Sequence, residues 1–284
     1  MSTDTFAIWP AGSPHLAAGI PAETSTAIVE PATGPAISVT NVSEPTLTRY
    51  APPQDKAHGG AVIVLPGGAF RCLMVDKEGA EIATWFAERG YVAFVLKYRV
   101  HDSDDDHLSR LLTVRAWRQA MQLMLPGRML AADDARQAVR TVRSGAVAFG
   151  VDPTRIGMIG FSAGAITTAT TLLGADVASR PDFGAVIYGA MPDEPVPHDA
   201  PPVFLVHADD DPLVPVGESV RMFEAWQARG RPSDLHRFDA GGHGFGMRRL
   251  GLPVDAWPQD LDRWLNRHGF NSPLGPPNRT DGTV

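Results

Sequence analysis

The five residues Gly160-Phe161-Ser162-Ala163-Gly164 decide the fold of this chain. They follow a short apolar run, Arg155-Ile156-Gly157-Met158-Ile159, and precede a stretch of small residues, 165–173, that can form a helix. In a strand–turn–helix context, G-x-S-x-G forms a nucleophile elbow, which exposes the serine hydroxyl above the edge of a sheet. The glycines let the strand and the helix approach closely. Because the same pattern also occurs in flexible loops, the rest of the chain must supply partners for Ser162.

The chain offers an acid and a histidine that could activate Ser162. A serine hydroxyl is a weak nucleophile at neutral pH unless a neighbouring base removes its proton. Three aspartates, Asp209-Asp210-Asp211, follow one apolar run, and His243 lies in a glycine-rich loop after the next predicted strand. The order serine, acid, histidine is that of α/β-hydrolases, and it predicts a catalytic triad of Ser162, Asp211 and His243.

Asp211 is the member of the aspartate run that we select as the acid. It directly precedes Pro212-Leu213-Val214-Pro215, where the chain leaves the predicted strand and turns toward the next helix. Asp209 and Asp210 are then expected to be solvated turn residues. For His243 the alternative is a surface histidine in a flexible turn, which the two preceding elements make the weaker interpretation.

A glycine-rich loop earlier in the chain is a candidate oxyanion hole. Acyl transfer passes through a tetrahedral oxyanion, so the site needs hydrogen-bond donors aimed at that charge. One predicted donor is the backbone N–H of Ala163, directly after the serine. The other is Gly67 or Gly68 of the loop Pro66-Gly67-Gly68-Ala69-Phe70, because Pro66 has no N–H. Phe70 is expected to contact the substrate. A plain tight turn is the alternative interpretation of this loop.

Buried apolar runs alternate with helical patterns along most of the chain. The predicted strands are Ala61–Leu65, Tyr91–Tyr98, Ile156–Gly160, Gly184–Tyr188, Val203–His207 and Asp234–Asp239. The predicted helices are Glu78–Arg89, Asp133–Phe149, Gly217–Gln227 and Ala256–Arg267. This alternation predicts an α/β fold with a mostly parallel central sheet and helices on both faces. One domain over residues 37–270 fits better than two, since no linker interrupts the pattern.

The two ends of the chain lack this alternation. Residues 1–36 are rich in Pro, Ala, Gly, Ser and Thr, and we expect an extended arm that lies over the body of the domain. Ile37–Asn41 and Thr46–Tyr50 are predicted to pair as strands around a turn at Ser43-Glu44-Pro45. Residues 271–284 are expected to be a mobile tail.

The segment 102–131 breaks the rhythm and is predicted to be a helical, lid-like insertion. Its apolar residues share one helical face, and they are Leu111, Val114, Trp117, Met121 and Met124. Pro126-Gly127 is expected to end this helix. A helix beside the carboxyl edge of the sheet could cover the site, with Trp117 and Met121 as an adaptable substrate wall. Core packing or a subunit interface in a homo-oligomer is an equally open interpretation of the stripe.

Composition limits the partners of this chain. The formal net charge is −7 and there is no basic run, so neither nucleic acid nor an anionic membrane surface is an expected partner. No apolar stretch reaches the length of a membrane span, and no secretory signal is evident, so we expect a cytoplasmic location. The chain contains no H-E-x-x-H pair, Walker loop or dinucleotide fingerprint, and no metal or organic cofactor is expected.

Several stretches resemble the α/β-hydrolase esterases related to acetylxylan esterases. They are Val42–Thr48, Leu65–Phe70, Glu78-Gly79, Phe94–Arg99, Asp152–Gly157 and Gly160–Gly164. The resemblance implies removal of acetyl or other short acyl groups from carbohydrates or small esters. Ala69 and Ala165 stand where such esterases commonly have glycine. These departures, together with the length of the 102–131 insertion, argue against a polymeric xylan substrate.

We therefore expect a serine esterase that acts on a carbohydrate or other small ester through an acyl-enzyme. The alternatives are a peptidase or amidase on the same fold, an acyltransferase, and a non-catalytic binding scaffold. Peptide selection is disfavoured because the chain has no propeller or other accessory domain. Matched ester and amide substrates, an added acceptor alcohol and a fluorophosphonate probe would distinguish these alternatives.

Overall fold

The computed structural model describes residues 3–14, 19–101, 116–174 and 176–272. The strands are β1 Thr3–Ala7, β2 Thr24–Glu30, β3 Gly34–Thr40, β4 Thr46–Tyr50, β5 Ala61–Leu65, β6 Cys72–Met74, β7 Val92–Lys97, β8 Ile156–Phe161, β9 Phe183–Ile187, β10 Val203–Ala208 and β11 Ser233–Phe238. The helices are α1 Glu81–Ala87, α3 Trp117–Leu123, α4 Leu125–Ser144, α5 Ala146–Phe149, α6 Ala163–Leu172, α7 Gly217–Ala228 and α8 Trp257–Arg267. A π-helical turn, Asp76–Ala80, precedes α1, and short 3-10 turns lie at Val177–Ser179 and Pro253–Ala256.

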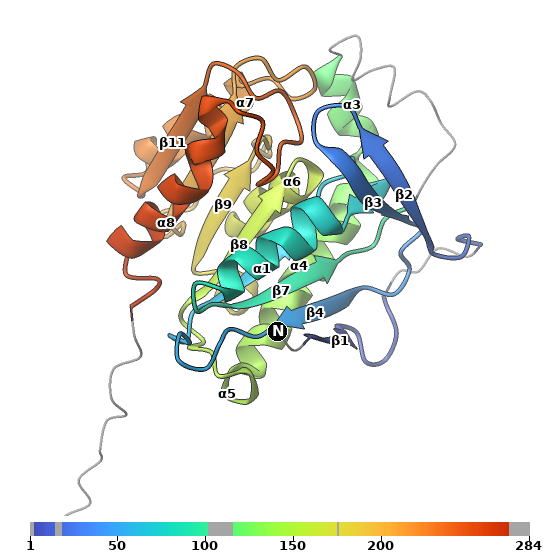
Figure 1. Ribbon diagram of the computed structural model, residues 1–284, viewed down its shortest axis with the longest axis vertical. Coiled ribbons are helices and arrows are strands. Elements are labelled where there is room, and N and C mark those ends of the chain that lie inside the picture. The colour runs from blue at the N-terminus through green and yellow to red at the C-terminus, as the bar shows by residue number, and fades with distance from the viewer. Residues whose placement is uncertain (1–2, 15–18, 102–115, 175, 273–284) are drawn as a thin grey trace, which may run out of the picture.

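Eight strands form one large sheet in the order β1-β4-β7-β5-β8-β9-β10-β11 (Figure 1). The six strands from β7 to β11 in this order run parallel, whereas β1 and β4 pair antiparallel at one edge. Every residue of β5 and β8 is buried, as expected for parallel strands that are covered on both faces. The predicted α/β fold with a mostly parallel central sheet is confirmed.

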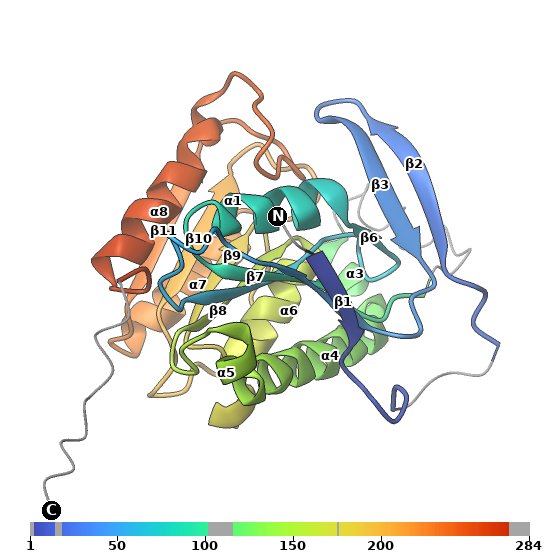
Figure 2. The same ribbon diagram turned by 60° about the horizontal axis from the view of Figure 1, so that its bottom comes forward.

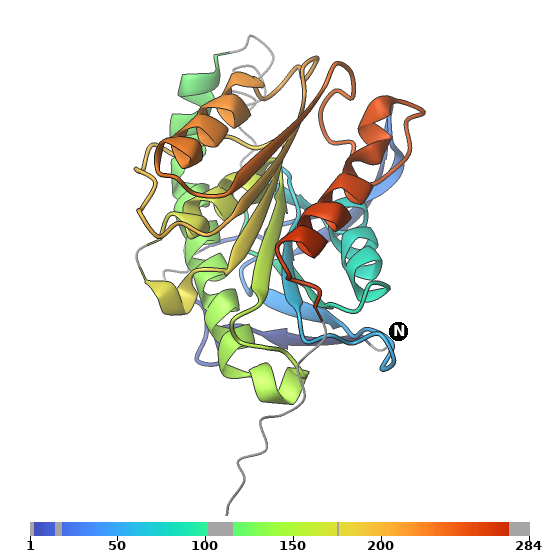
Figure 3. The same ribbon diagram turned by 90° about the vertical axis from the view of Figure 1, so that its left-hand side faces the viewer.

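Helices cover both faces of this sheet (Figure 3). The cyan α1 and the red α8 lie on one side, and the green α4 and the orange α7 lie on the other. Phe86 and Trp264 belong to the core on the first face, and Val139 and Trp226 to the cores on the second. The loops after β5, β8, β10 and β11 all leave the carboxyl edge of the sheet, where α/β folds bind their ligands.

A second sheet of three antiparallel strands, β2-β3-β6, stands beside the large one (Figure 2). The predicted pairing of Ile37–Asn41 with Thr46–Tyr50 is therefore wrong. Instead, β3 pairs with β2 and β6, and β4 pairs with β1 and β7. Residue types identify a strand, but the pairing register and partners depend on which neighbours bury the same face.

The N-terminal residues differ from the predicted arm because they are built into both sheets. β1 forms an edge of the large sheet, and β2 is an outer strand of the small one. Trp9 Nε1 donates to the buried carboxylate of Asp134 at 2.8 Å, and Arg99 pairs with the same carboxylate at 2.7 Å. These contacts join the start of the chain to α4 and to the end of β7.

The predicted insertion at 102–131 is only partly visible, since residues 102–115 lie outside the described residues, as do 273–284 of the predicted tail. From residue 116 onward it consists of α3 and the first turns of α4. Pro126 lies in the first turn of α4, so it begins a second helix directly after the end of the first. A proline is favoured there because the N–H groups of the first turn have no helical partner. Among the helices within the described ranges, none is long and apolar enough to cross a membrane.

Candidate active site

Ser162 occupies a strained turn between β8 and α6. Its φ of 52° lies in the left-handed region, at a typical cost of about 1–3 kcal/mol for a residue with a side chain. Gly160 and Gly164 make the turn possible. A Cβ on Gly160 would lie 2.1 Å from the carbonyl oxygen of Gly164, and a Cβ on Gly164 would lie 2.1 Å from that of Leu65. The turn therefore places Ser162 at the carboxyl edge of the sheet and at the N-terminus of α6.

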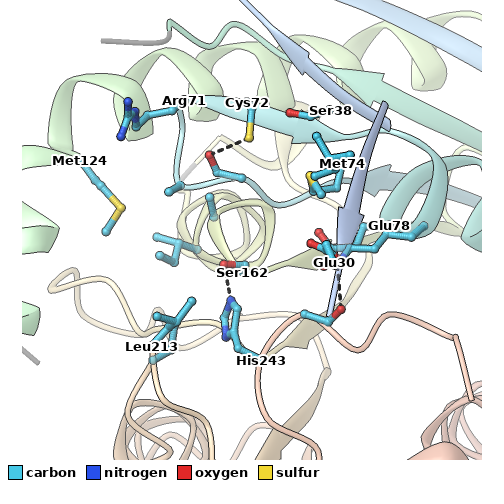
Figure 4. Close-up of a pocket in the computed structure, with 18 of the residues that line it drawn as sticks. Glu30, Ser38, Arg71, Cys72, Met74, Glu78, Met124, Ser162, Leu213 and His243 are labelled. Atoms are coloured by element: carbon cyan, nitrogen blue, oxygen red, sulfur yellow. Dashed lines mark hydrogen bonds and ion pairs between the residues drawn. The ribbon is translucent and has the colours of Figure 1, made fainter. Parts of the chain in front are cut away.

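Ser162, His243 and Asp211 form a continuous chain of hydrogen bonds. His243 Nε2 lies 2.8 Å from Ser162 Oγ (Figure 4), and its Nδ1 lies 2.7 Å from Asp211 Oδ2. Because a carboxylate only accepts, Nδ1 carries the proton, and Nε2 is left to accept from the serine hydroxyl. The side chain of Asp211 is fully shielded from solvent and that of His243 is 12% exposed. The structure thus brings together the three side chains selected from the sequence.

Asp211 is surrounded by hydrogen-bond donors. Its Oδ1 accepts from the N–H groups of Leu213 and Val214 at 2.8 and 2.9 Å, and its Oδ2 lies 3.3 Å from His207 Nε2. Burial by itself would raise the pKa of Asp211, but the hydrogen bonds from His207 and His243 outweigh burial and hold the pKa well below its ordinary value. Asp211 is therefore a carboxylate that can orient the imidazole and stabilise its protonated form.

A second histidine, His207, lies beside Asp211, whereas the sequence predicted only that it ends a strand. Its side chain is fully buried, with Nδ1 2.7 Å from Ser219 Oγ and Nε2 3.0 Å from the carbonyl oxygen of Val214. Both groups that face Nε2, this carbonyl and the Asp211 carboxylate, are acceptors. Nε2 therefore carries a proton, and His207 holds both the loop after β10 and the carboxylate on that loop.

Replacing His207 by alanine should lower kcat by about 10- to 100-fold, because a hydrogen bond to a buried charge is lost. In His207→Gln the amide nitrogen can still donate to Asp211, and we expect most of the activity to remain. Ester hydrolysis measured from about pH 5 to 9, together with thermal unfolding, separates the two effects. A fall in Tm with unchanged kcat in His207→Ala would show that His207 serves only stability.

The loop that carries His243 is held by Asp210. Asp210 Oδ1 accepts from the N–H groups of Gly241 and Gly242 at 3.0 and 2.7 Å. Asp209 and Asp210 are both exposed turn residues, as expected, and Asp209 pairs with an arginine of β11. The bonds to Gly241 and Gly242 give Asp210 a structural role that was not predicted. The predicted pair of Asp211 and His243 brings these two loops together, but the sequence does not show that Asp210 would bond to the histidine loop.

The loop after β5 differs from the prediction in the N–H groups that it leaves free. Gly67 N–H donates to the buried carboxylate of Glu78 at 2.8 Å, so Gly67 is not available to an oxyanion. Within the described part of the chain, the N–H groups of Gly68, Ala69 and Ala163 have no backbone or side-chain acceptor. All three residues line the cavity beside the serine. The candidate oxyanion hole therefore consists of Ala163 with Gly68 or Ala69.

A cavity of about 530 Å³ opens beside Ser162, a volume that suits a small molecule. One part of its wall is apolar and includes Trp117, Met124, Ile166, Leu213 and Val214. The opposite part comes from the small sheet and the π-helical turn, and its polar residues are Glu30, Ser38, Thr40, Lys77 and Glu78. Figure 4 shows Met124 and Leu213 on one side of Ser162 and Glu30 and Glu78 on the other.

Of the three predicted substrate contacts, only Trp117 lines this cavity. Met121 lines a neighbouring cavity of about 640 Å³ that shares Trp117. Phe70 is 5% exposed and belongs to the core, where its ring lies 6.5 Å from that of Tyr98. The wall that β2 and β3 provide was not predicted from the sequence. The β-branched residues of Thr24–Glu30 were the available signal for a strand there.

A protein-family comparison relates this site to known proteins. Residues 48–259, well over half of the chain, match the model of the Dienelactone hydrolase family. The chain belongs to this family. The range that matches the dienelactone hydrolases contains Ser162, Asp211 and His243, together with the loop after β5.

The curated relatives of this dienelactone hydrolase family member are larger proteins. The acetylxylan esterase of Xylanibacter ruminicola is 25% identical over 240 residues, which cover 73% of this chain and 45% of that protein. Endo-1,4-beta-xylanase B of Butyrivibrio fibrisolvens is 24% identical over 229 residues, which cover 67% of this chain and 33% of that protein. The chain thus spans less than half the length of either relative.

Solved structures of similar size share the fold of this dienelactone hydrolase family member. The acetyl ester-xyloside bifunctional hydrolase of Caldicellulosiruptor lactoaceticus is 26% identical, with a TM-score of 0.66 over 94% of this chain and 97% of that one. Esterase 2 of Thermogutta terrifontis, with butyrate bound, is 23% identical, with a TM-score of 0.62 over 83% of this chain and 93% of that one. At the latter identity the similarity concerns the fold alone.

Proposed function

We propose that this dienelactone hydrolase family member is a serine esterase that removes acetyl or other short acyl groups from esters of carbohydrates or small alcohols. The observation that carries the proposal is the hydrogen-bonded chain Ser162–His243–Asp211, with contacts of 2.8 and 2.7 Å, at the edge of a small-molecule cavity. The names of the acetylxylan esterase and the acetyl ester-xyloside hydrolase support acetyl transfer to water as the reaction.

In the proposed mechanism His243 removes the proton of Ser162 as Oγ attacks the ester carbonyl carbon. Asp211 stabilises the imidazolium that forms, and the N–H groups of Ala163 and of Gly68 or Ala69 stabilise the oxyanion. The imidazolium then gives its proton to the leaving alcohol, which breaks the ester bond and leaves an acyl-serine. Water, deprotonated by the same imidazole, attacks the acyl carbon. The imidazolium then returns its proton to Ser162 Oγ as the acyl–oxygen bond breaks, which releases the carboxylic acid and restores the serine hydroxyl.

The two walls of the cavity favour a substrate with one apolar and one polar part. Trp117, Met124 and Leu213 can enclose a short acyl chain, whereas Ser38 and Thr40 offer hydroxyl groups to a hydroxylated alcohol. The apolar part of the cavity limits the length of the acyl chain that it can enclose, because a methylene group that finds no room there loses its favourable apolar contacts. We therefore expect short acyl chains and a polar leaving alcohol.

A series of nitrophenyl acetate, butyrate and octanoate tests this proposal. The kcat/KM for acetate and butyrate should exceed that for octanoate by about tenfold or more. Acetylated xylose should be hydrolysed as well. The variant Trp117→Ala enlarges the cavity at its apolar wall. The ratio of kcat/KM for acetate to that for octanoate should therefore fall in this variant. A wild-type preference for octanoate would contradict the short-acyl proposal, and cleavage of matched amides at comparable rates would favour a peptidase or amidase.

A further inference from the structure

Glu78 is a buried carboxylate beside the candidate oxyanion hole, and the proposed mechanism does not use it. It is 2% exposed and lies in the π-helical turn Asp76–Ala80. Its Oε2 accepts from the N–H of Gly67 at 2.8 Å, and its Oε1 accepts from the hydroxyl of Tyr188 at 2.7 Å. Carboxylates are rarely buried unless their oxygens are bonded, and here each oxygen has a partner in a different loop of the site.

The loop that Glu78 holds has an unfavourable backbone conformation. Gly68, Ala69 and Phe70 have φ values of 137°, 54° and 60°, and two of these residues carry side chains. Such conformations persist only where the surroundings impose them, and they concentrate at functional sites. The bond from Gly67 N–H to Glu78 is an anchor directly before this strained stretch. It also turns the Gly67 donor away from the oxyanion and leaves that role to the residues after it.

Tyr188 extends the contact to the loop of the general base. Its hydroxyl accepts from the N–H of Gly246 at 3.1 Å, and its ring lies 4.9 Å from the ring of His243. Burial and the neighbouring Glu78 carboxylate raise the pKa of Tyr188 well above its ordinary value. The hydroxyl therefore stays protonated and donates a hydrogen bond to Glu78. Tyr188 itself has a φ of 41°, so it is a further strained residue in this network.

Lys77, the neighbour of Glu78, makes a parallel contact with the histidine loop. Its Nζ is buried, donates to the carbonyl oxygen of Gly244 at 2.9 Å and pairs with Glu30 of the small sheet. The π-helical turn therefore contacts the loop after β5 through Glu78. It contacts the loop after β11 directly through Lys77, and indirectly through Tyr188, which bonds to Glu78. Short π-helical segments are frequent at functional sites.

We propose that Glu78 is a positioning residue: by bridging the Gly67 amide and Tyr188, it sets the oxyanion donors at a fixed distance from His243. This inference rests on the proposed esterase function. It predicts that loss of Glu78 weakens binding of the transition state much more than binding of the substrate, because donor geometry matters most when the negative charge develops.

The test uses Glu78→Ala, Glu78→Gln and Tyr188→Phe, with Glu88→Ala as the control at an exposed glutamate just after α1. Glu78→Ala should lower kcat for nitrophenyl acetate by about 10²- to 10³-fold, with KM within about threefold of wild type. The Kd of a boronic acid that forms a tetrahedral adduct with Ser162 should rise by the same factor. Glu78→Gln keeps one acceptor oxygen, so its kcat should fall less than that of Glu78→Ala. The kcat and KM of Glu88→Ala should equal those of the wild type.

A double variant separates positioning from stability. If Tyr188 acts through Glu78, then Tyr188→Phe should lower kcat in the wild-type background but add little in the Glu78→Ala background. Should Glu78→Ala fail to fold, Glu78→Gln and Tyr188→Phe carry the test through the same split between kcat and KM. The inference is overturned if the wild type is an active esterase and these variants keep its kcat, or if they change KM alone. An inactive wild type would instead refute the proposed function.

Discussion

Replacing Ser162 by alanine should reduce kcat for ester hydrolysis on the order of 10⁶-fold, the scale seen when a serine hydrolase loses its nucleophile. The physical reason is that the alanine variant cannot form an acyl-enzyme, although the oxyanion donors and the cavity remain. Among the described residues, the Ser162 hydroxyl is the only group that donates to His243 Nε2, so no other hydroxyl is in place to substitute for it.

Two measurements check this prediction. The first is the steady-state rate with nitrophenyl acetate, and the second is covalent labelling by a fluorophosphonate followed by peptide mapping. Ser144→Ala, at an exposed serine near the end of α4, is the matched control and should behave as wild type. Labelling of a residue other than Ser162, or substantial activity in Ser162→Ala, would show that the proposed nucleophile is wrong.

Asp211→Asn should lower kcat by about 10⁴-fold with little change in overall structure. The asparagine amide would present a donor to His243 Nδ1, so the imidazole would take the other tautomer and carry its proton on Nε2. That nitrogen could then no longer accept the proton of Ser162. The control is Asp209→Asn at the exposed neighbour that pairs with an arginine of β11. If Asp209→Asn were the damaging change and Asp211→Asn were active, the acid would be misassigned.

The same variant should also change the pH dependence of stability. The pKa of Asp211 is held well below its ordinary value, so the folded protein keeps the carboxylate ionised where the unfolded chain would protonate it. This contribution to stability is present above about pH 4 and is lost as the pH falls through the folded pKa. The difference in unfolding free energy between wild type and Asp211→Asn should therefore shrink below about pH 4, as measured by denaturant titration at several pH values.

The sequence alone was sufficient to predict the parallel sheet and the three side chains that meet at the candidate site. The apolar runs at β5, β7, β8, β9 and β10 are buried on both faces, so residue type alone identifies them as strands of a covered sheet. The elbow was recognisable because only glycine fits at Gly160 and Gly164. Such constraints act between residues that are close in sequence, and they leave a visible pattern there.

Contacts between distant segments were decided by the tertiary structure. The sequence could not show that Gly67 N–H would bond to Glu78, that Asp210 would hold the histidine loop, or that His207 would face Asp211. Phe70 was assigned to the site by its place in the loop after β5, and Met121 by its place in an apolar helical stripe. The packing places Phe70 in the core and Met121 in another cavity.

The small sheet illustrates the same limit. Residues 24–40 form a hairpin whose inner face lines the cavity, whereas composition predicted an arm and a different strand pair. A strand can complete its hydrogen bonds with any edge of suitable register, so its partner is selected by the burial of whole faces. Local residue patterns thus determined most of the elements and the three side chains that meet at the candidate site. The assembled fold alone determined which amides are free, which acids are bonded and what encloses the cavity beside Ser162.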